Sequence, residues 1–318
     1  MKIFLHIGTH KTGSTFIQEI LKKSHDALKN NGVYYPVDGY SQAGHHELAW
    51  AVMKNDSVSA KKYLEDALYK ASGCSCIVFS SEEFEFIKNI GLLKTLLKGH
   101  EVELVCYFRR QDNYLESEYN QHVKMISTKF KYDIFMFYMY YDFHRRFNYM
   151  ALMESWRKQE FISRFHVFSY DKVVRDSSLV DSFFSFLGVS YNFIETIEFG
   201  KKSNESIPAS SLIYLSRLNA IDGVSQGDRN LFIKKIQEEM SKKNKSASNK
   251  KECFLSQEYS SRLVNRFHGS NNKLAKNYCG GEELFDTVTP DNHHVVVDFY
   301  NDFDRDFYLK IIEKLNFS

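Results

Sequence analysis

The sequence predicts an α/β fold in which a parallel sheet lies between helices and the last third of the chain is mostly helical. Short apolar runs alternate with segments whose apolar residues recur at helical spacing, which is typical of a parallel sheet covered on both faces. Hydrophobic residues make up 43% of the 318 residues and charged residues 26%, so the chain can bury a core and is not disordered. The chain contains only three prolines, which favours long helices.

The expected strands are short apolar runs that end at a glycine, a proline or a polar cluster. They comprise residues 3–7, 33–35, 77–79, 102–108 and 165–168. The helices expected between and after them comprise residues 14–29, 46–53, 58–69, 84–97, 112–125 and 178–187. Beyond residue 200 the pattern becomes helical. No strand is expected between the helices at residues 212–218, 231–240, 259–275 and 307–315.

Charge and cysteine content limit the class of protein. The chain has 42 basic and 40 acidic residues, a net charge of +2, which argues against a general nucleic-acid-binding protein. No stretch of about 18 apolar residues occurs, so no transmembrane helix is expected, and the apolar start is too short for a signal peptide. The five cysteines lack framework spacing and fit a reducing compartment, so we expect a cytoplasmic location. Cys74 and Cys76 have no second pair at zinc spacing, so no metal site is expected.

The most informative segment joins the first expected strand to the first expected helix. It reads Gly8-Thr9-His10-Lys11-Thr12-Gly13-Ser14-Thr15. A glycine-bearing loop in this position can bind an anion, because glycine lets backbone amides approach a ligand and the helix N-terminus offers free N–H groups. The hydroxyls of Ser14 and Thr15 add further donors there.

Gly8 and Gly13 have the spacing of a nucleoside-triphosphate P-loop. Such a loop has lysine directly after the second glycine, whereas this sequence has Ser14 there and places Lys11 inside the loop. The run Lys-Thr-Gly-Ser-Thr after the first strand instead resembles the 5′-phosphosulfate loop of the sulfotransferases. These enzymes use 3′-phosphoadenosine 5′-phosphosulfate (PAPS).

A second motif lies at the end of the strand expected at residues 102–108. Arg109 follows that strand directly, and Ser117 stands eight positions later on the next helix. This spacing resembles the 3′-phosphate signature of the same family. The chemistry agrees, because an arginine at the carboxyl end of a parallel strand lies where open α/β folds bind ligands, and it can bind a phosphate bidentately. Arg110 and Gln111 stand where Asn-Pro is common in the eukaryotic enzymes, and they resemble the bacterial branch of carbohydrate sulfotransferases.

The resemblance covers about residues 1–285 and implies a P-loop-kinase-like fold. Residues 80–82 resemble an acceptor-side motif, and residues 165–171 resemble a later strand with its Tyr-Asp exit. The implied organisation is a single domain over the whole chain. It has a sheet-containing core, a helical part that closes over the cofactor and an extension of unassigned role, at residues 1–200, 201–285 and 286–318.

The implied activity is transfer of a sulfuryl group from PAPS to a hydroxyl of a carbohydrate acceptor, on a polysaccharide, a glycolipid or an oligosaccharide. The implied nucleotide product is adenosine 3′,5′-bisphosphate, and no metal is required. Lys11 is implied to stabilise the bridging oxygen as charge builds on the leaving phosphate. The residues implied to hold the nucleotide are His10, Lys11, Thr12, Gly13, Ser14, Thr15, Arg109, Ser117, Lys201 and Lys202.

A general base must also take the proton of the acceptor. Members of the family use a glutamate or a histidine, so the candidates here are Glu82, Glu83, His45 and His46. Glu82 is favoured because it stands at the carboxyl end of the third expected strand, close to the loop. His46 is the second choice. The simpler interpretation makes Glu82 a helix cap and the two histidines surface residues.

Three questions stay open at this level. The aromatic-rich residues 130–149 form either a buried helix, which could also pack against a second copy in a homodimer, or an acceptor cleft where rings stack on sugars. An exposed apolar patch there could contact a membrane surface. Two other functions compete with sulfuryl transfer. They are a P-loop-type kinase or nucleotide phosphotransferase, and a nucleotide-binding module without catalysis.

Overall fold

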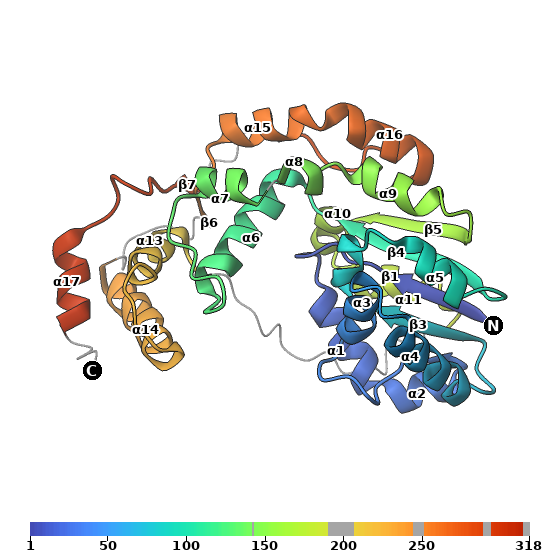
Figure 1. Cartoon of the computed structure of the whole chain (residues 1–318). Coiled ribbons are helices and arrows are strands. Elements are labelled where there is room, and N and C mark those ends of the chain that lie inside the picture. The colour runs from blue at the N-terminus through green and yellow to red at the C-terminus, as the bar shows by residue number, and fades with distance from the viewer. Residues whose placement is uncertain (142, 190–206, 244–250, 289–293, 314–318) are drawn as a thin grey trace. The chain divides into compact units, whose positions relative to one another are not determined.

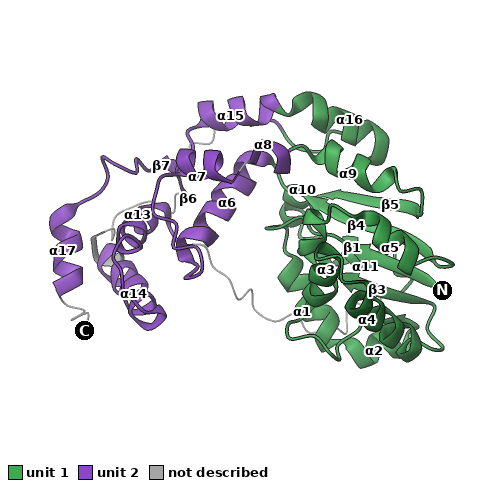
Figure 2. Cartoon of the chain, in the orientation of Figure 1, with its two compact units in different colours: residues 1–110, 148–203, 267–286 green, residues 111–147, 204–266, 287–318 purple. Residues whose placement is uncertain are grey.

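The computed structural model describes residues 1–141, 143–189, 207–243, 251–288 and 294–313 (Figure 1). The chain forms two compact units that interleave along the sequence (Figure 2). The first unit comprises Met1–Arg110, Asn148–Ser203 and Phe267–Asp286, and the second comprises Gln111–Phe147, Asn204–Arg266 and Thr287–Ser318. No single cut in the sequence separates these units. The expected organisation as one domain over residues 1–318 stays a prediction.

The first unit is built on a five-stranded parallel sheet with the strand order β2-β3-β1-β4-β5. The strands are β1 (Lys2–His6), β2 (Val33–Tyr34), β3 (Cys76–Ser80), β4 (Glu101–Phe108) and β5 (Ile162–Ser169). The first strand of the sequence is therefore the central one, and Leu5 lies between Phe79 and Leu104. The predicted fold class, a parallel sheet flanked by helices, is confirmed.

Both faces of this sheet are buried. Ile3, Leu5 and Ile7 pack into one apolar cluster and Phe4 into the other, as the alternation of side chains along a strand requires.

The helices of this unit are α1 (Ser14–Lys23), α2 (His25–Asn30), α3 (His46–Met53), α4 (Ser57–Lys70), η1 (Glu82–Phe86, a 3₁₀ helix), α5 (Ile90–Leu96), α9 (Tyr149–Arg157), α10 (Tyr170–Arg175), α11 (Leu179–Phe184) and α16 (His268–Tyr278).

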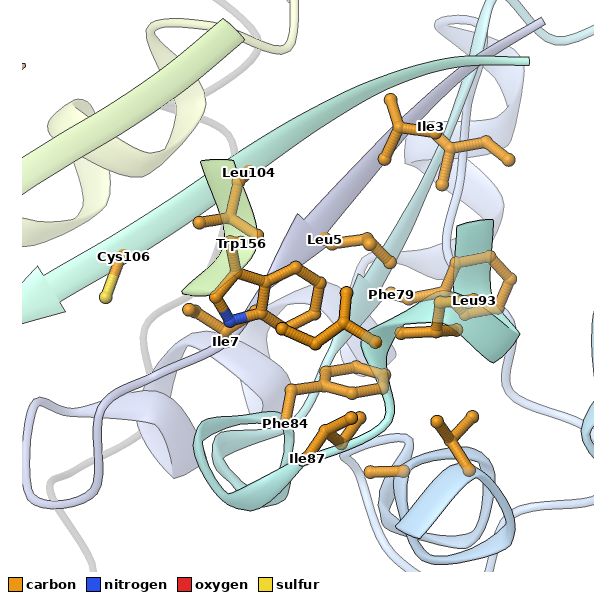
Figure 3. Close-up of a cluster of buried hydrophobic side chains, with 14 of the residues drawn as sticks. Ile3, Leu5, Ile7, Phe79, Phe84, Ile87, Leu93, Leu104, Cys106 and Trp156 are labelled. Atoms are coloured by element: carbon orange, nitrogen blue, oxygen red, sulfur yellow. The ribbon is translucent and has the colours of Figure 1, made fainter. Parts of the chain in front are cut away.

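The larger apolar cluster includes side chains from α3, α4, η1, α5, α9 and α16. Trp156 of α9 is fully buried there, among Leu5, Ile7 and Phe84 (Figure 3). The smaller cluster joins the other sheet face to α1, α2 and α11. Because both ends of β1 are locked into these clusters, the loop that follows β1 leaves a rigid point of the sheet.

Several expected elements need correction. The helix expected at residues 14–29 is two helices, because Ser24 leaves helical geometry (φ −94°, ψ 12°) between α1 and α2. The helix expected at residues 84–97 is split into η1 and α5, because Ile87 is extended (φ −64°, ψ 122°). The helix expected at residues 259–275 is likewise two helices, α15 (Gln257–Arg266) and α16.

The second unit is mostly helical, as expected, but the expectation that it lacks strands is wrong. Two three-residue strands, β6 (Lys251–Cys253) and β7 (His294–Val296), pair in parallel. Each is too short to give a periodic signal. The helices of this unit are α6 (Gln111–Lys124), α7 (Ile134–Tyr140), α8 (Phe143–Arg146), α13 (Ala209–Leu218), α14 (Gln226–Lys243), α15 and α17 (Arg305–Glu313).

The extension at residues 286–318 contributes β7 and α17 to the second unit. The guanidinium of Arg217, on α13, lies over the rings of Phe299 and Phe303 at 4.7 and 5.2 Å from the ring centres. Such cation–π contacts add to the apolar burial of this segment. The extension is therefore packed against α13.

The aromatic-rich residues divide between core and surface. Phe137, Phe143 and Phe147 are fully buried within the second unit, whereas Phe135 and Tyr140 of α7 are 48% and 76% exposed. The interpretation as a buried helix therefore holds for one face of α7. None of the described helices is both long enough and apolar enough to cross a membrane.

Candidate anion-binding site

The site begins with the loop between β1 and α1. Its first residues continue the sheet, since the backbone N–H of Thr9 donates to Tyr107 O at 2.9 Å and that of Tyr107 donates to Gly8 O at 2.7 Å. The loop then turns through three left-handed residues, Gly8 (φ 87°), Lys11 (φ 61°) and Gly13 (φ 77°). Lysine is uncommon in this conformation, and its presence shows that the surroundings hold the loop.

The end of the loop leaves the start of α1 open. Gly13 is the N-cap and makes no side-chain hydrogen bond to the helix, so the first N–H groups of α1 have no side-chain cap. Thr15 is exposed in the first turn, whereas Ser14 and Thr12 are buried. A helix N-terminus without a side-chain cap is suited to an anionic group.

Two loop hydroxyls are used internally. The hydroxyl of Thr12 donates to Thr9 O at 2.6 Å, and that of Ser14 points to the same carbonyl at 3.4 Å. These contacts stabilise the turn. An anion at this loop would therefore meet Thr12 through its backbone.

Gly8 and Gly13 are required by contact as well as by conformation. A Cβ atom added at Gly8 would lie 2.9 Å from the Cβ of Glu82 and 3.0 Å from its Cα. A Cβ at Gly13 would lie 2.9 Å from Leu179 Cδ2 and 3.2 Å from Tyr170 Cε2. At 2.9 Å an added Cβ forces a neighbour to shift. η1 therefore approaches the loop directly at Gly8, and α10 and α11 approach it at Gly13.

We expect Gly8→Ala to lower the free energy of unfolding by about 2–4 kcal/mol, because it adds a contact with the Glu82 backbone to the cost of a left-handed alanine. Gly73→Ala is a matched control, since Gly73 has nearly the same angle (φ 86°) and nothing within 4 Å of the added atom. Its expected loss is about 1–2 kcal/mol. Urea denaturation measures both variants, and equal losses would show that the contact with Glu82 has no energetic weight.

Arg109 reaches this loop from the end of β4. Its Nη1 donates to Lys11 O at 3.1 Å, and its guanidinium lies over the Tyr170 ring at 5.4 Å from the ring centre. Its Nε is buried and has no hydrogen-bond partner in the part of the chain that the structure describes. Burial raises the pKa of the Tyr170 hydroxyl, and the nearby guanidinium opposes that shift. Arg109 thus supports the loop and keeps a donor available.

Arg110 points elsewhere. Its backbone N–H donates to the Asp171 carboxylate at 2.6 Å, which ties the end of β4 to the start of α10. Its Nη1 lies 3.5 Å from Asp286 O. Of the two adjacent arginines, Arg109 is therefore the one directed at the loop.

Glu82 stands at the start of η1, beside the first glycine of the loop. Its Oε2 accepts a hydrogen bond from Gln18 Nε2 at 3.0 Å, and the same nitrogen lies 3.2 Å from the Ser80 hydroxyl. Ser80 in turn lies 2.7 Å from His6 Nδ1. His6 is fully buried, and burial lowers the pKa of its imidazole to about 3, so this histidine is neutral.

The two neighbouring histidines, His45 and His46, differ in how their ring nitrogens are hydrogen-bonded. His45 is fully buried. Its Nδ1 accepts from the Ser80 backbone N–H at 2.8 Å and its Nε2 lies 2.9 Å from Pro36 O. Burial lowers the pKa of His45 to about 4. With both nitrogens in use, His45 is a structural residue. His46 is also buried, and its Nδ1 lies 2.8 Å from the Ser81 hydroxyl. The simpler interpretation, in which the two histidines are surface residues, is wrong.

Glu83 faces His10 of the loop. His10 Nε2 lies 3.6 Å from a Glu83 carboxylate oxygen, and the interaction with His10 holds the pKa of Glu83 below its usual range, although burial opposes this shift. Interactions with Trp50 and His46 lower this pKa further. His10 thus links the loop to the acidic start of η1.

The structure brings together Lys11, Gly13, Arg109 and Glu82 around one loop. Ser117 lies in the second turn of α6, which belongs to the second unit. Lys201 and Lys202 lie outside the described residues. No group of three or more histidine, cysteine or acidic side chains is arranged to hold a metal within the described ranges.

Three residues that contact this site were not among those predicted from the sequence. Gln18 is 2% exposed on the apolar face of α1, and a polar residue on such a face is the signal that could have found it. Tyr170 was noted only as part of a strand exit. Glu85, the third acidic residue of η1, gave no separate signal, because its contact with the loop spans 75 positions of sequence.

No family model matches the chain. An uncharacterized protein of Archaeoglobus fulgidus is 26% identical over 212 residues, a segment that covers 66% of this chain and 55% of that protein. A solved structure, the sulfotransferase domain from the Synechococcus PCC 7002 olefin synthase, is 12% identical with a TM-score of 0.32, covering 74% of this chain and 94% of that domain. The function of the chain is therefore inferred from the loop and from the side chains around it.

Proposed function

We propose that the chain is a PAPS-dependent sulfotransferase that transfers a sulfuryl group to a hydroxyl of a carbohydrate acceptor. The observation that carries the proposal is the approach of the Arg109 guanidinium to the β1–α1 loop, with its buried Nε lacking a partner among the described residues. Buried donors are normally satisfied, and a phosphate supplies acceptors that fit the arginine fork. Arg109 and the loop thus form a site for a ligand with two anionic groups.

The residues present fit the nucleotide that the sequence implies. The N–H groups at the start of α1, including that of Ser14, would hold the 5′-phosphate together with the exposed Thr15. Arg109 would hold the 3′-phosphate. Ser117 stays a sequence-based prediction for the same phosphate, since it belongs to the second unit. Lys201 and Lys202 keep their implied role of closing over the nucleotide. When bound, PAPS supplies the sulfuryl group and a bisphosphate leaving group. Lys11 stands at the turn of the loop, where its ammonium can stabilise the charge of that leaving group.

Glu82 is the favoured general base. Its Oε2 is held by Gln18, and its Oε1 accepts no hydrogen bond from any described residue, so one oxygen is available for a proton. The amide nitrogen of Gln18 must face this carboxylate, because an ionised carboxylate can only accept. Glu83 and His46 remain alternatives, whereas His45 has no free nitrogen. The carbohydrate nature of the acceptor rests on the resemblance of the sequence to the bacterial branch.

We expect Glu82→Gln to lower kcat about 10²–10⁴-fold, because the amide cannot take the acceptor proton. The affinity for adenosine 3′,5′-bisphosphate should change by less than about threefold, since the substitution preserves shape beside Gly8. Transfer of radiolabelled sulfate from PAPS to carbohydrate acceptors measures the first quantity, and calorimetry measures the second. Glu83→Gln and His46→Gln serve as controls. A larger loss of kcat in either control would move the role of base to that residue.

The function itself is tested by calorimetric titration with adenosine 3′,5′-bisphosphate and with ATP, each in the presence and absence of magnesium. Tight binding of the bisphosphate without magnesium, with weak binding of ATP, supports the proposal. Preferred, magnesium-dependent binding of ATP would instead indicate a P-loop-type kinase. Binding of the bisphosphate without transfer to any acceptor would indicate a nucleotide-binding module.

A further inference from the structure

Two carboxylates lie beside a loop that is suited to anions, although their own charge is negative. Glu83 and Glu85 both contact His10, at 3.6 and 3.1 Å, and their side chains are 25% and 5% exposed. Negative charge near an anion site weakens the binding of an anion. A buried carboxylate in this position is therefore costly unless it performs a task that outweighs the repulsion.

The contacts of Glu85 show what that task is. One oxygen of its carboxylate, Oε2, accepts from the backbone N–H of His10 at 3.1 Å and lies 3.1 Å from Nδ1 of the same residue. The His10 ring also packs on Phe86, with 5.0 Å between ring centres. Backbone and side chain of one loop residue are thus held by a single residue of η1, and η1 is anchored by the fully buried Phe84.

A contact that holds His10 also restrains the residue that follows it. His10 directly precedes Lys11, which adopts a left-handed conformation and whose carbonyl oxygen accepts from Arg109. The loop is therefore held at residue 10 by Glu85 and at residue 11 by Arg109. The Lys11 side chain starts from the backbone between these two contacts.

We propose that Glu85 is a positioning residue that acts through His10 to hold the β1–α1 loop in its anion-binding conformation. This role of Glu85 rests on the proposed function for one point only, which is the identity of the ligand. Glu85 itself touches no part of that ligand in this scheme. Its effect is to preorganise the loop amides and Lys11, so that binding does not have to order them.

The test uses the full chain and three variants, Glu85→Ala, Glu85→Gln and the control Glu83→Gln, titrated with adenosine 3′,5′-bisphosphate. Glu85→Ala should weaken binding about tenfold. Glu85→Gln should restore it to within about threefold of the wild type, because the amide oxygen can still accept from the His10 backbone. Glu83→Gln should leave binding unchanged or slightly tighter. If all three variants bind more tightly, Glu85 acts as a repulsive charge alone and the proposal fails.

A second readout requires no ligand. Hydrogen exchange of the amides of residues 8–15 should accelerate about tenfold or more in Glu85→Ala and remain near the wild-type rate in Glu83→Gln and Glu85→Gln. Unchanged loop exchange in Glu85→Ala overturns the positioning role, even where the melting temperature falls. Faster loop exchange in a protein whose wild type ignores the bisphosphate would refute the proposed function and leave the positioning role supported.

Discussion

Replacement of Lys11 by alanine is expected to lower the rate of sulfuryl transfer about 10²–10³-fold, the usual cost of removing one preorganised group that stabilises transition-state charge. The affinity for adenosine 3′,5′-bisphosphate should fall much less, because the loop amides and Arg109 still contact that product. The backbone at residue 11 is held by the contact of its carbonyl with Arg109. The substitution therefore removes the ammonium and leaves the loop supported.

The measurement is transfer of labelled sulfate from PAPS under saturating conditions, alongside calorimetry of the bisphosphate. Lys23→Ala is the matched control, since Lys23 lies at the other end of α1 and is exposed, within 3.8 Å of Glu19. It removes the same charge from the helix that follows the loop and should leave kcat unchanged. Near-normal transfer by Lys11→Ala would contradict the role assigned to the ammonium.

Replacement of Arg109 by alanine is expected to weaken the binding of adenosine 3′,5′-bisphosphate by about 2–5 kcal/mol, or roughly 30- to 4,000-fold in Kd. This is the usual loss when one partner of a buried charge pair is removed. The loss has two sources in this structure. One is the missing contact with the 3′-phosphate, and the other is the release of Lys11 O and of the Tyr170 ring.

Comparing two ligands separates these sources. Adenosine 5′-phosphate lacks the 3′-phosphate, so its affinity should fall only by the part that comes from the loop. Arg110→Ala should affect both ligands little, because the Arg110 side chain points toward Asp286 O. If Arg109→Ala weakens both ligands equally, Arg109 only supports the loop, and the 3′-phosphate must be held by another residue.

The candidate site divides into parts that the sequence could predict and parts that it could not. The loop is contiguous in sequence, and the glycine spacing with the displaced Lys11 already indicated an anion site with an unusual lysine. Arg109 was predictable because it follows an apolar strand directly. The contacts that hold these residues join positions 75 to 98 apart, as between His10 and Glu85 or Lys11 and Arg109. No local pattern encodes such pairs.

The histidines illustrate the same limit. His45 and His46 follow a short strand and precede an apolar helix, and the sequence left open whether they act as a base or are surface residues. The structure buries both and uses both nitrogens of His45. A histidine gives no periodic signal of burial, because its role depends on which donors and acceptors the fold brings to its two nitrogens.

By itself, the sequence determined the parallel α/β core, the loop after the first strand and the arginine at the end of another strand. These features depend on local conformational preference and on the burial of short apolar runs. Both are determined by residues that are close together in the sequence. The tertiary structure alone decided which of Arg109 and Arg110 faces the loop, how Gln18 holds Glu82 and how Glu85 holds His10. Those choices arise from strand order and close packing, which bring together side chains that are distant in the chain.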